Sequence, residues 1–172
     1  MEQKMKDIMT ESIKGFKLPS FSEIPDVGLY LEQVVKFVAG YLEPLPNITI
    51  TSSMISNYVK KGIIANPIKK FYNREQIAYI IFIAIAKTVL SLEDLQLMIN
   101  LQKDTYESKI AYEYFCKEFE NILKFVFGLK DSIEEISSRN SDEKTLLRNT
   151  ANAIAHKIYL DEFTAMLKEN ME

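Results

Sequence analysis

Apolar residues recur every third or fourth position along most of the chain, which is the spacing of an amphipathic helix. This spacing predicts a short helix within residues 1–16. After a proline- and serine-containing loop at residues 17–25, it predicts a second helix, capped by Asp26 and ended near Glu43 by the prolines that follow. Residues 77–86 form the longest apolar run, so we expect the helix around them to be the central core helix.

Three polar residues mark the starts of further helices. Thr51 is placed to cap a helix that runs to Lys61, where Gly62 stops it. Asn73 is expected to cap the core helix, which runs to about residue 89, and Ser91 is expected to cap a short helix after it. Between the first two helices, the β-prone runs 63–64 and 70–72 flank residues 65–69 and predict a small two-stranded hairpin, or wing.

Two long helices are expected after Asp104. The first has a heptad-like apolar seam from Phe115 to Leu129, and the second runs over about residues 143–168. The polar stretch 131–142 is the expected turn between them. The sequence therefore predicts a mostly α fold in three parts: an N-terminal helical or flexible segment at 1–17, a winged helix-turn-helix at 18–100, and a helical region at 101–172.

Composition narrows the class of protein. The 172 residues are 47% hydrophobic and 26% charged, values typical of a folded domain and not of a disordered one. Cys116 and His156 are the sole residues of their types, which excludes an internal disulfide and a multi-histidine metal site. The first 16 residues do not read as a secretory signal, and the longest apolar run is too short for a bilayer. We therefore expect a cytoplasmic protein with no membrane partner and no cofactor.

Charge is distributed unevenly along the chain. The whole chain carries a formal charge of −3, but no acidic residue lies between Glu43 and Glu75. That window holds five basic residues: Lys60, Lys61, Lys69, Lys70 and Arg74. Such a local basic surface is typical of a protein that binds nucleic acid, although an accidental basic face explains the charge alone equally well.

The expected order of elements, with positive charge on the second helix and on the wing, is that of a winged helix-turn-helix. In that arrangement a helix enters the major groove and the wing lysines reach the flanking phosphates. The outward face of the predicted helix at 51–61 is rich in serine and asparagine, which are mediocre helix formers but suitable donors to phosphates and base edges.

Three stretches carry a resemblance to a known family: ITSSMISNYVKKGII, KFYNREQI and VLSLEDLQLMI. Together they resemble the DNA-binding half of the MerR family over residues 48–100. Residues 18–100 also resemble an uncharacterised bacterial family, domain of unknown function 1836. These resemblances imply a winged helix-turn-helix and a DNA-binding role, with no known target.

The MerR resemblance implies roles for individual positions. Tyr58 matches the tyrosine of the family's recognition helix, Lys70 stands at the wing arginine, and Tyr72 matches a tyrosine that contacts phosphate. Ser56 replaces the family's helix arginine, and the first helix lies further upstream than in the family. Two shorter helices replace the family's long dimerising coiled coil.

The sequence thus predicts a DNA-binding transcriptional regulator with double-stranded DNA as its partner. The predicted DNA-binding residues are Ser52, Ser53, Ser56, Asn57, Lys60, Lys61, Lys69, Lys70, Tyr72 and Arg74. A homodimer is expected, with its contact in the helices after residue 104. The alternative is a helical protein-interaction module without DNA binding. No phosphate loop, metalloprotease motif or nucleophile elbow is present, so we expect no catalytic residues, no metal and no enzyme activity.

Overall fold

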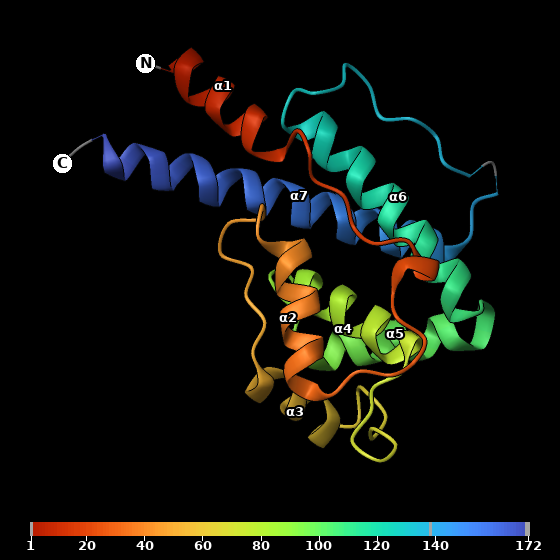
Figure 1. Ribbon diagram of the computed structural model, residues 1–172. Helices are drawn as coiled ribbons and strands as arrows, with labels where there is room; N and C mark the ends of the chain where they lie inside the picture. Colours follow the sequence, from red (N-terminus) through yellow and green to blue (C-terminus); the bar gives the residue numbers. More distant parts are fainter. Residues whose placement is uncertain (1, 138, 171–172) are drawn as a thin grey trace.

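The computed structural model describes residues 2–137 and 139–170 and contains seven α-helices in that part of the chain (Figure 1). One short 3-10 helix, η1, lies at Phe21–Glu23. The α-helices are α1 (Glu2–Ile13), α2 (Leu31–Leu42), α3 (Ser52–Lys60), α4 (Arg74–Ala86), α5 (Leu92–Thr105), α6 (Ser108–Val126) and α7 (Asp142–Glu169). The mostly α prediction is confirmed, as are the two long C-terminal helices.

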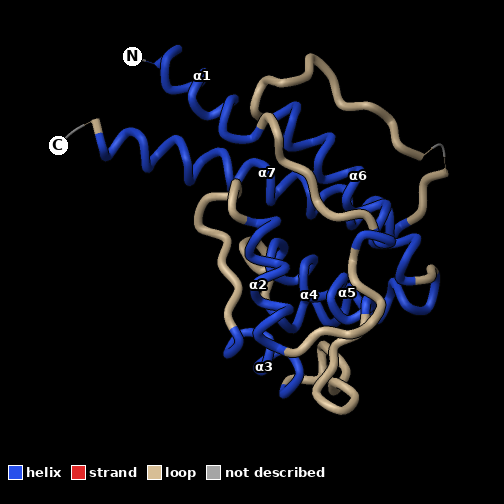
Figure 2. The backbone as a smooth tube through the Cα atoms, in the orientation of Figure 1, coloured by secondary structure: helices blue, strands red, loops and turns tan. Residues whose placement is uncertain are grey.

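The predicted two-stranded wing is wrong. Figure 2 shows helices and loops with no strand in the described residues, and two isolated antiparallel bridges, Leu29 with Tyr72 and Ile68 with Phe71, stand where a sheet was expected. Residues 63–64, the first β-prone run, terminate α3 instead. The N–H groups of Ile63 and Ile64 both donate to the Tyr58 carbonyl, at 3.0 and 3.3 Å, so neither pairs with a second strand. The winged helix-turn-helix fold class is therefore not the fold of this chain.

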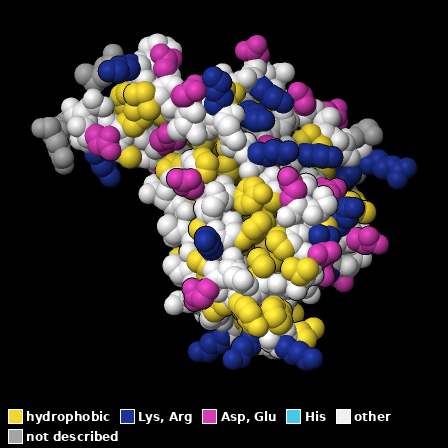
Figure 3. Space-filling model, viewed as in Figure 1, with side chains coloured by type: hydrophobic (Ala, Val, Ile, Leu, Met, Phe, Trp, Pro, Cys, Tyr) yellow, Lys and Arg dark blue, Asp and Glu magenta, His cyan; other side chains and the backbone are white. Residues whose placement is uncertain are grey.

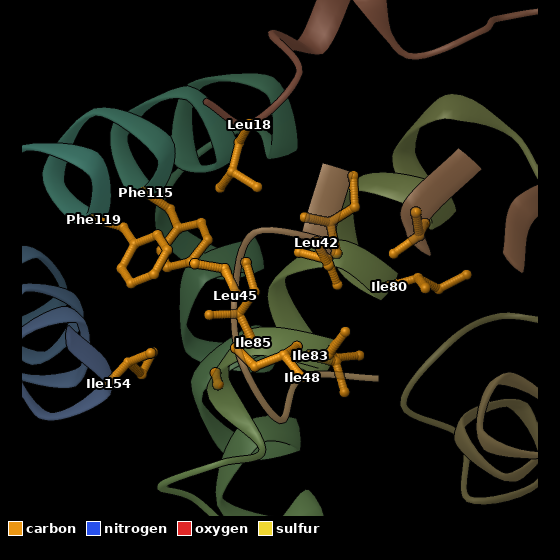
Figure 4. Close-up of a cluster of buried hydrophobic side chains, with 14 of the residues drawn as sticks. Leu18, Leu42, Leu45, Ile48, Ile80, Ile83, Ile85, Phe115, Phe119 and Ile154 are labelled. Atoms are coloured by element: carbon orange, nitrogen blue, oxygen red, sulfur yellow. The ribbon is translucent and has the colours of Figure 1, made fainter. Parts of the chain in front are cut away.

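The core is built around α4. Nine of the 13 residues of this helix are buried, on all of its sides, as expected for a helix that is apolar nearly all round. It contacts α2, α5, α6 and α7. Figure 4 shows Ile80, Ile83 and Ile85 from α4 within the same cluster as Phe119 from α6 and Ile154 from α7.

The C-terminal helices continue the same core. In Figure 1, α6 and α7 run side by side, α1 lies against α7, and the described ends of the chain lie on the same side of the molecule. Thr10 Oγ1 donates to the Phe127 carbonyl at 2.8 Å, and Ser12 Oγ donates to Glu162 Oε1 at 2.8 Å. One continuous cluster of buried residues extends from Met9 to Ile158, so apolar packing crosses both of the predicted domain boundaries.

Three of the predicted helix caps are confirmed, and one is wrong. The side chains of Thr51, Asn73 and Ser91 each accept a hydrogen bond from the backbone three residues later. Asp26 does not cap α2, because that helix begins five residues later with Tyr30 at the cap position. Asp26 lies in the preceding loop, where its carboxylate is 3.7 Å from the guanidinium of Arg74. Within the described residues, no helix has the length and apolarity needed to cross a bilayer.

Candidate nucleic-acid interface

The helix α3 presents a polar face to solvent and an apolar face to the core. Ile55 and Tyr58 point inward and are 0% and 2% exposed. Burial raises the pKa of Tyr58 to about 12, so its phenol stays neutral. Ser53, Ser56 and Asn57 are exposed on the opposite side. This division follows from the helical period, because positions three and four apart share one face.

Both ends of α3 are fixed by local hydrogen bonds. At the start, Thr51 Oγ1 accepts from the N–H of Met54 at 3.2 Å. At the end, Gly62 has a φ of 74°, a left-handed conformation that glycine adopts without steric cost, and its N–H donates to the Val59 carbonyl. The orientation of the polar face is therefore set by the sequence on either side of the helix.

Ser52 is less open than its neighbours on α3. Its hydroxyl donates to Glu32 Oε1 at 2.8 Å, and the residue is half-buried. Glu32 thus brings a carboxylate to the N-terminus of α3, where the helix dipole favours negative charge. That carboxylate opposes the approach of a phosphate to this end of the helix.

Four lysines are exposed at the other end of α3 and beyond it: Lys60, Lys61, Lys69 and Lys70. Among the described residues, none of the four forms an ion pair with a carboxylate. Figure 3 shows basic side chains gathered at the lower end of the molecule, where Figure 1 places α3 and the loop that follows it. We call these four residues the basic end.

Lys69 and Lys70 form the tip of a tight turn. Their φ angles are 50° and 70°, and the backbones of Ile68 and Phe71 exchange hydrogen bonds of 3.1 and 2.9 Å across them. Positive φ at both central residues is the signature of a type I′ turn, for which Asn-Gly is the preferred pair. A left-handed conformation costs a residue with a Cβ roughly 1–2 kcal/mol. The turn therefore holds two lysines at a position where local stability favours other residues.

The segment before α2 anchors this turn. Leu29 and Tyr72 exchange backbone hydrogen bonds of 3.0 and 2.9 Å. The ring of Tyr30 stacks on the ring of Phe71 with a centroid distance of 4.3 Å. Gly28 has a φ of 80°, and a Cβ there would lie 3.1 Å from Phe71 Cβ. The left-handed backbone and the close approach of the Phe71 side chain both favour glycine at this position.

Two of the predicted contact residues are engaged by other parts of the protein, one buried and one partly exposed. Tyr72 is 4% exposed, and burial raises the pKa of its phenol. Arg74 Nε donates to the Ile24 carbonyl at 2.6 Å, its Nη2 donates to the Ser22 carbonyl at 3.3 Å, and its guanidinium lies over the Phe21 ring. The Arg74 side chain and the Tyr72 backbone, which pairs with Leu29, hold the loop before α2 in place. Neither side chain projects into solvent as the four lysines do.

The comparisons with known proteins give one match. The family model for a domain of unknown function, DUF1836, matches residues 19–119. The chain belongs to this family. No curated protein and no solved structure matches the chain, so the MerR resemblance has no support from a relative. The DUF1836 region includes η1 and α2 to α5 and ends within α6, beyond the predicted boundary at residue 100.

Within the DUF1836 region, the basic end is accompanied by exposed apolar side chains that the sequence analysis did not single out. Val27 is 82% exposed and Ile68 is 73% exposed, while Tyr30 and Phe71 are 49% and 37% exposed. In Figure 3, hydrophobic side chains lie next to the basic ones at the lower end of the molecule. We call Val27, Tyr30, Ile68 and Phe71 the apolar tip. In the sequence, this patch was signalled by the apolar residues on both sides of Lys69 and Lys70.

The remaining reactive residues offer no second site. Cys116 is 8% exposed, and burial raises the pKa of its thiol to about 12, which keeps it protonated and unreactive. His156 is exposed on α7. Within residues 2–137 and 139–170, no three His, Cys, Asp or Glu side chains converge on a point where a metal ion would bind.

Proposed function

We propose that the chain binds double-stranded DNA, with the basic end on the phosphates and the polar face of α3 toward the base edges. The observation that carries the proposal is the exposure of four lysines without acidic partners in a window that has no acidic residue. Exposed ammonium groups near a duplex release condensed counterions when they neutralise phosphates, and this release drives association.

The strained turn supports the same proposal. Strain at an exposed tip persists only where the surrounding structure enforces it, and such positions cluster at functional sites. Here the Leu29 bridge and the Tyr30 stack enforce it. Lysine at two left-handed positions is best explained by a demand for charge at the tip.

The polar face of α3 supplies side chains suited to base edges. Asn57 is exposed and carries both a donor and an acceptor, which allows a bidentate contact to adenine. Ser53 and Ser56 are exposed on the same helix and donate to phosphates or bases. Tyr72 contributes through its backbone pairing with Leu29, which anchors the turn, and Arg74 by holding the loop before α2, whereas Ser52 is turned toward Glu32 and away from this role.

The test is equilibrium binding of the full chain to a mixed-sequence duplex, measured by fluorescence anisotropy at low salt. Lys60→Gln, Lys61→Gln, Lys69→Gln and Lys70→Gln together remove the basic end and should weaken binding by about tenfold or more. The matched control replaces four exposed lysines elsewhere, Lys4, Lys36, Lys109 and Lys168, by glutamine and should bind as the unchanged chain does. Equal binding by all three proteins would show that the basic end is not the interface.

The second candidate function is a protein-interaction module that does not bind DNA. The exposed apolar tip favours it, because an exposed apolar patch with a polar rim is typical of a protein-binding site. Val27→Ser with Ile68→Ser should then abolish capture of a protein partner from a lysate, while duplex DNA is not retained by either form. Salt-dependent retention of DNA would instead favour the first proposal.

We also propose a homodimer that uses the C-terminal helices. Leu160 and Leu167 are exposed at 57% and 39%, and their spacing of seven residues puts them on one face of α7. A second copy would cover this face and give the assembly two basic ends. Sedimentation analysis should show a dimer that Leu160→Glu converts to monomer, while a monomeric unchanged chain would overturn this proposal.

A further inference from the structure

A largely apolar pocket lies between the DUF1836 region and the start of α7. Its volume is about 360 Å³, which is within the range of small-molecule sites. Side chains from α4, α5, α6 and α7 form its walls, and Ile136 and Ser137 from the segment between α6 and α7 complete it. The apolar part of the lining includes Ala78, Phe82, Ile99, Ala111, Phe115 and Leu147.

The mouth of the pocket is also apolar. Leu101, Ile110 and Leu146 line the pocket and remain 41%, 54% and 41% exposed. They come from three different helices, α5, α6 and α7. A ligand with an apolar body would cover these side chains as well as fill the interior, and the removal of that surface from water would favour binding.

Lys144 places a cation at this apolar site. Its Nζ donates to Ser137 Oγ at 2.5 Å and to the Arg139 carbonyl at 3.3 Å, and it lies 5.5 Å from the centre of the Tyr114 ring. All of these partners are neutral, and no described carboxylate pairs with Lys144. An ammonium held only by neutral groups gains most from an added anion, because a charge-assisted hydrogen bond is the stronger kind.

Most of the other polar groups of the lining are hydrogen-bonded or neutral, and the exceptions are Glu113 and Lys117. Glu143 accepts a hydrogen bond from Thr105 Oγ1 at 3.1 Å and lies in the first turn of α7, where the helix dipole stabilises its charge. Tyr79 Oη is hydrogen-bonded to Gln102 and Ser108. The Tyr114 hydroxyl is buried beside the Glu118–Arg148 pair, and burial raises its pKa, so it stays neutral. Glu113 and Lys117 complete the charged lining with one charge of each sign.

We propose that this pocket binds a small amphipathic molecule whose apolar body fills the interior and whose carboxylate pairs with Lys144. This site is separate from the basic end and does not depend on the proposed DNA binding. The aromatic rings and short alanine side chains of the lining accept an acyl chain or an aromatic ring, and Lys144 selects for an anionic head group.

The experiment uses the full chain and isothermal titration calorimetry with decanoate, decanol and decyltrimethylammonium, each below its micelle concentration. Decanoate should bind about tenfold more tightly than decanol, since it alone gains the charge-assisted hydrogen bond, and the ammonium compound should bind least. Lys144→Met keeps the apolar stem and should abolish the difference between decanoate and decanol. Lys109→Met removes an exposed lysine outside the pocket and should leave it unchanged.

A second variant tests the interior of the pocket. Ala111→Phe adds a ring to the pocket wall and should block decanoate and decanol alike, while circular dichroism and thermal unfolding establish that the variant is folded. The proposal is overturned if the unchanged chain binds neither compound. It is also overturned if Lys144→Met keeps the preference for decanoate, or if a folded Ala111→Phe variant binds as the unchanged chain does.

Discussion

The ring of Tyr30 lies against the ring of Phe71, with centroids 4.3 Å apart and planes inclined by 27°. The two residues are distant in sequence, and Phe71 directly follows the strained lysine pair. Their contact therefore connects the residue before α2 with the turn that carries Lys69 and Lys70. Because α2 also packs against α3 and α4, the tip is held relative to both helices.

Loss of this stack should loosen the turn. Tyr30→Ala is expected to lower the free energy of unfolding by about 1 kcal/mol, the size of an aromatic pair interaction. Urea unfolding of Tyr30→Ala, Phe71→Ala and the double variant measures the coupling between the rings. Additive effects of the two substitutions would show that the rings do not stabilise each other.

Replacement of Lys69 and Lys70 by the residues preferred in a type I′ turn should raise stability and weaken DNA binding. Lys69→Asn with Lys70→Gly relieves the left-handed strain and is expected to raise the free energy of unfolding by about 1 kcal/mol. The same change should weaken DNA binding, because two charges are lost. Lys69→Gln with Lys70→Gln is the control, since it removes the charges and keeps the strain. A stability gain in the control equal to that of the Asn-Gly variant would contradict the strain argument.

An ion pair between a partly exposed arginine on α7 and a buried glutamate on α6 joins these two helices. Arg148 Nε donates to Glu118 Oε1 at 2.6 Å, and the Glu118 side chain is 1% exposed. Arg148→Met would leave a buried carboxylate without its partner and should cost about 3 kcal/mol. Glu118→Gln added to this variant should recover most of the loss. Thermal and urea unfolding give both values, and a fully stable Arg148→Met variant would show that the pair is dispensable.

Glu120 should make stability depend on pH in the direction opposite to most carboxylates. Burial raises the pKa of its side chain in the folded protein, although the Leu18 N–H donates to Oε1 at 2.9 Å and lowers it in part. A carboxyl whose folded pKa is raised opposes folding when it is ionised. That opposition fades as the pH falls through the folded pKa toward the unfolded value of about 4.3.

Glu120→Gln should therefore stabilise the protein at pH 7 and give no advantage at pH 4. An amide oxygen still accepts the hydrogen bond from Leu18. The exposed Glu135→Gln variant is the control. Urea unfolding at several pH values measures the effect, and a Glu120→Gln variant that is less stable than the unchanged chain at pH 7 would contradict it.

The parts of the fold that depend on residues close together in the sequence were predictable. The caps of Thr51, Asn73 and Ser91 each involve a backbone N–H three residues away, so the local sequence contains both partners. The wing was mispredicted because β-propensity does not reveal that Ile63 and Ile64 donate their N–H groups to the end of α3. Because these two N–H groups are hydrogen-bonded at the end of α3, they cannot pair with a second strand.

The candidate site was predictable only in part for a similar reason. Exposure of Lys60 and Lys69 follows from their position at the end of a helix and at the tip of a turn. The hydrogen bonds of Arg74 depend on carbonyls about 50 residues upstream, which no local pattern contains. The pocket is assembled from four helices and one connecting segment, so the sequence gives no direct signal for it.

The salt dependence of duplex binding shows whether the basic end neutralises phosphates. If the four lysines of the basic end each neutralise one phosphate, the logarithm of the association constant should fall against the logarithm of salt concentration with a slope of about −3 to −4. The slope should approach zero when all four lysines are replaced by glutamine. An unchanged slope in that variant, or no measurable binding by the unchanged chain at low salt, would contradict the account.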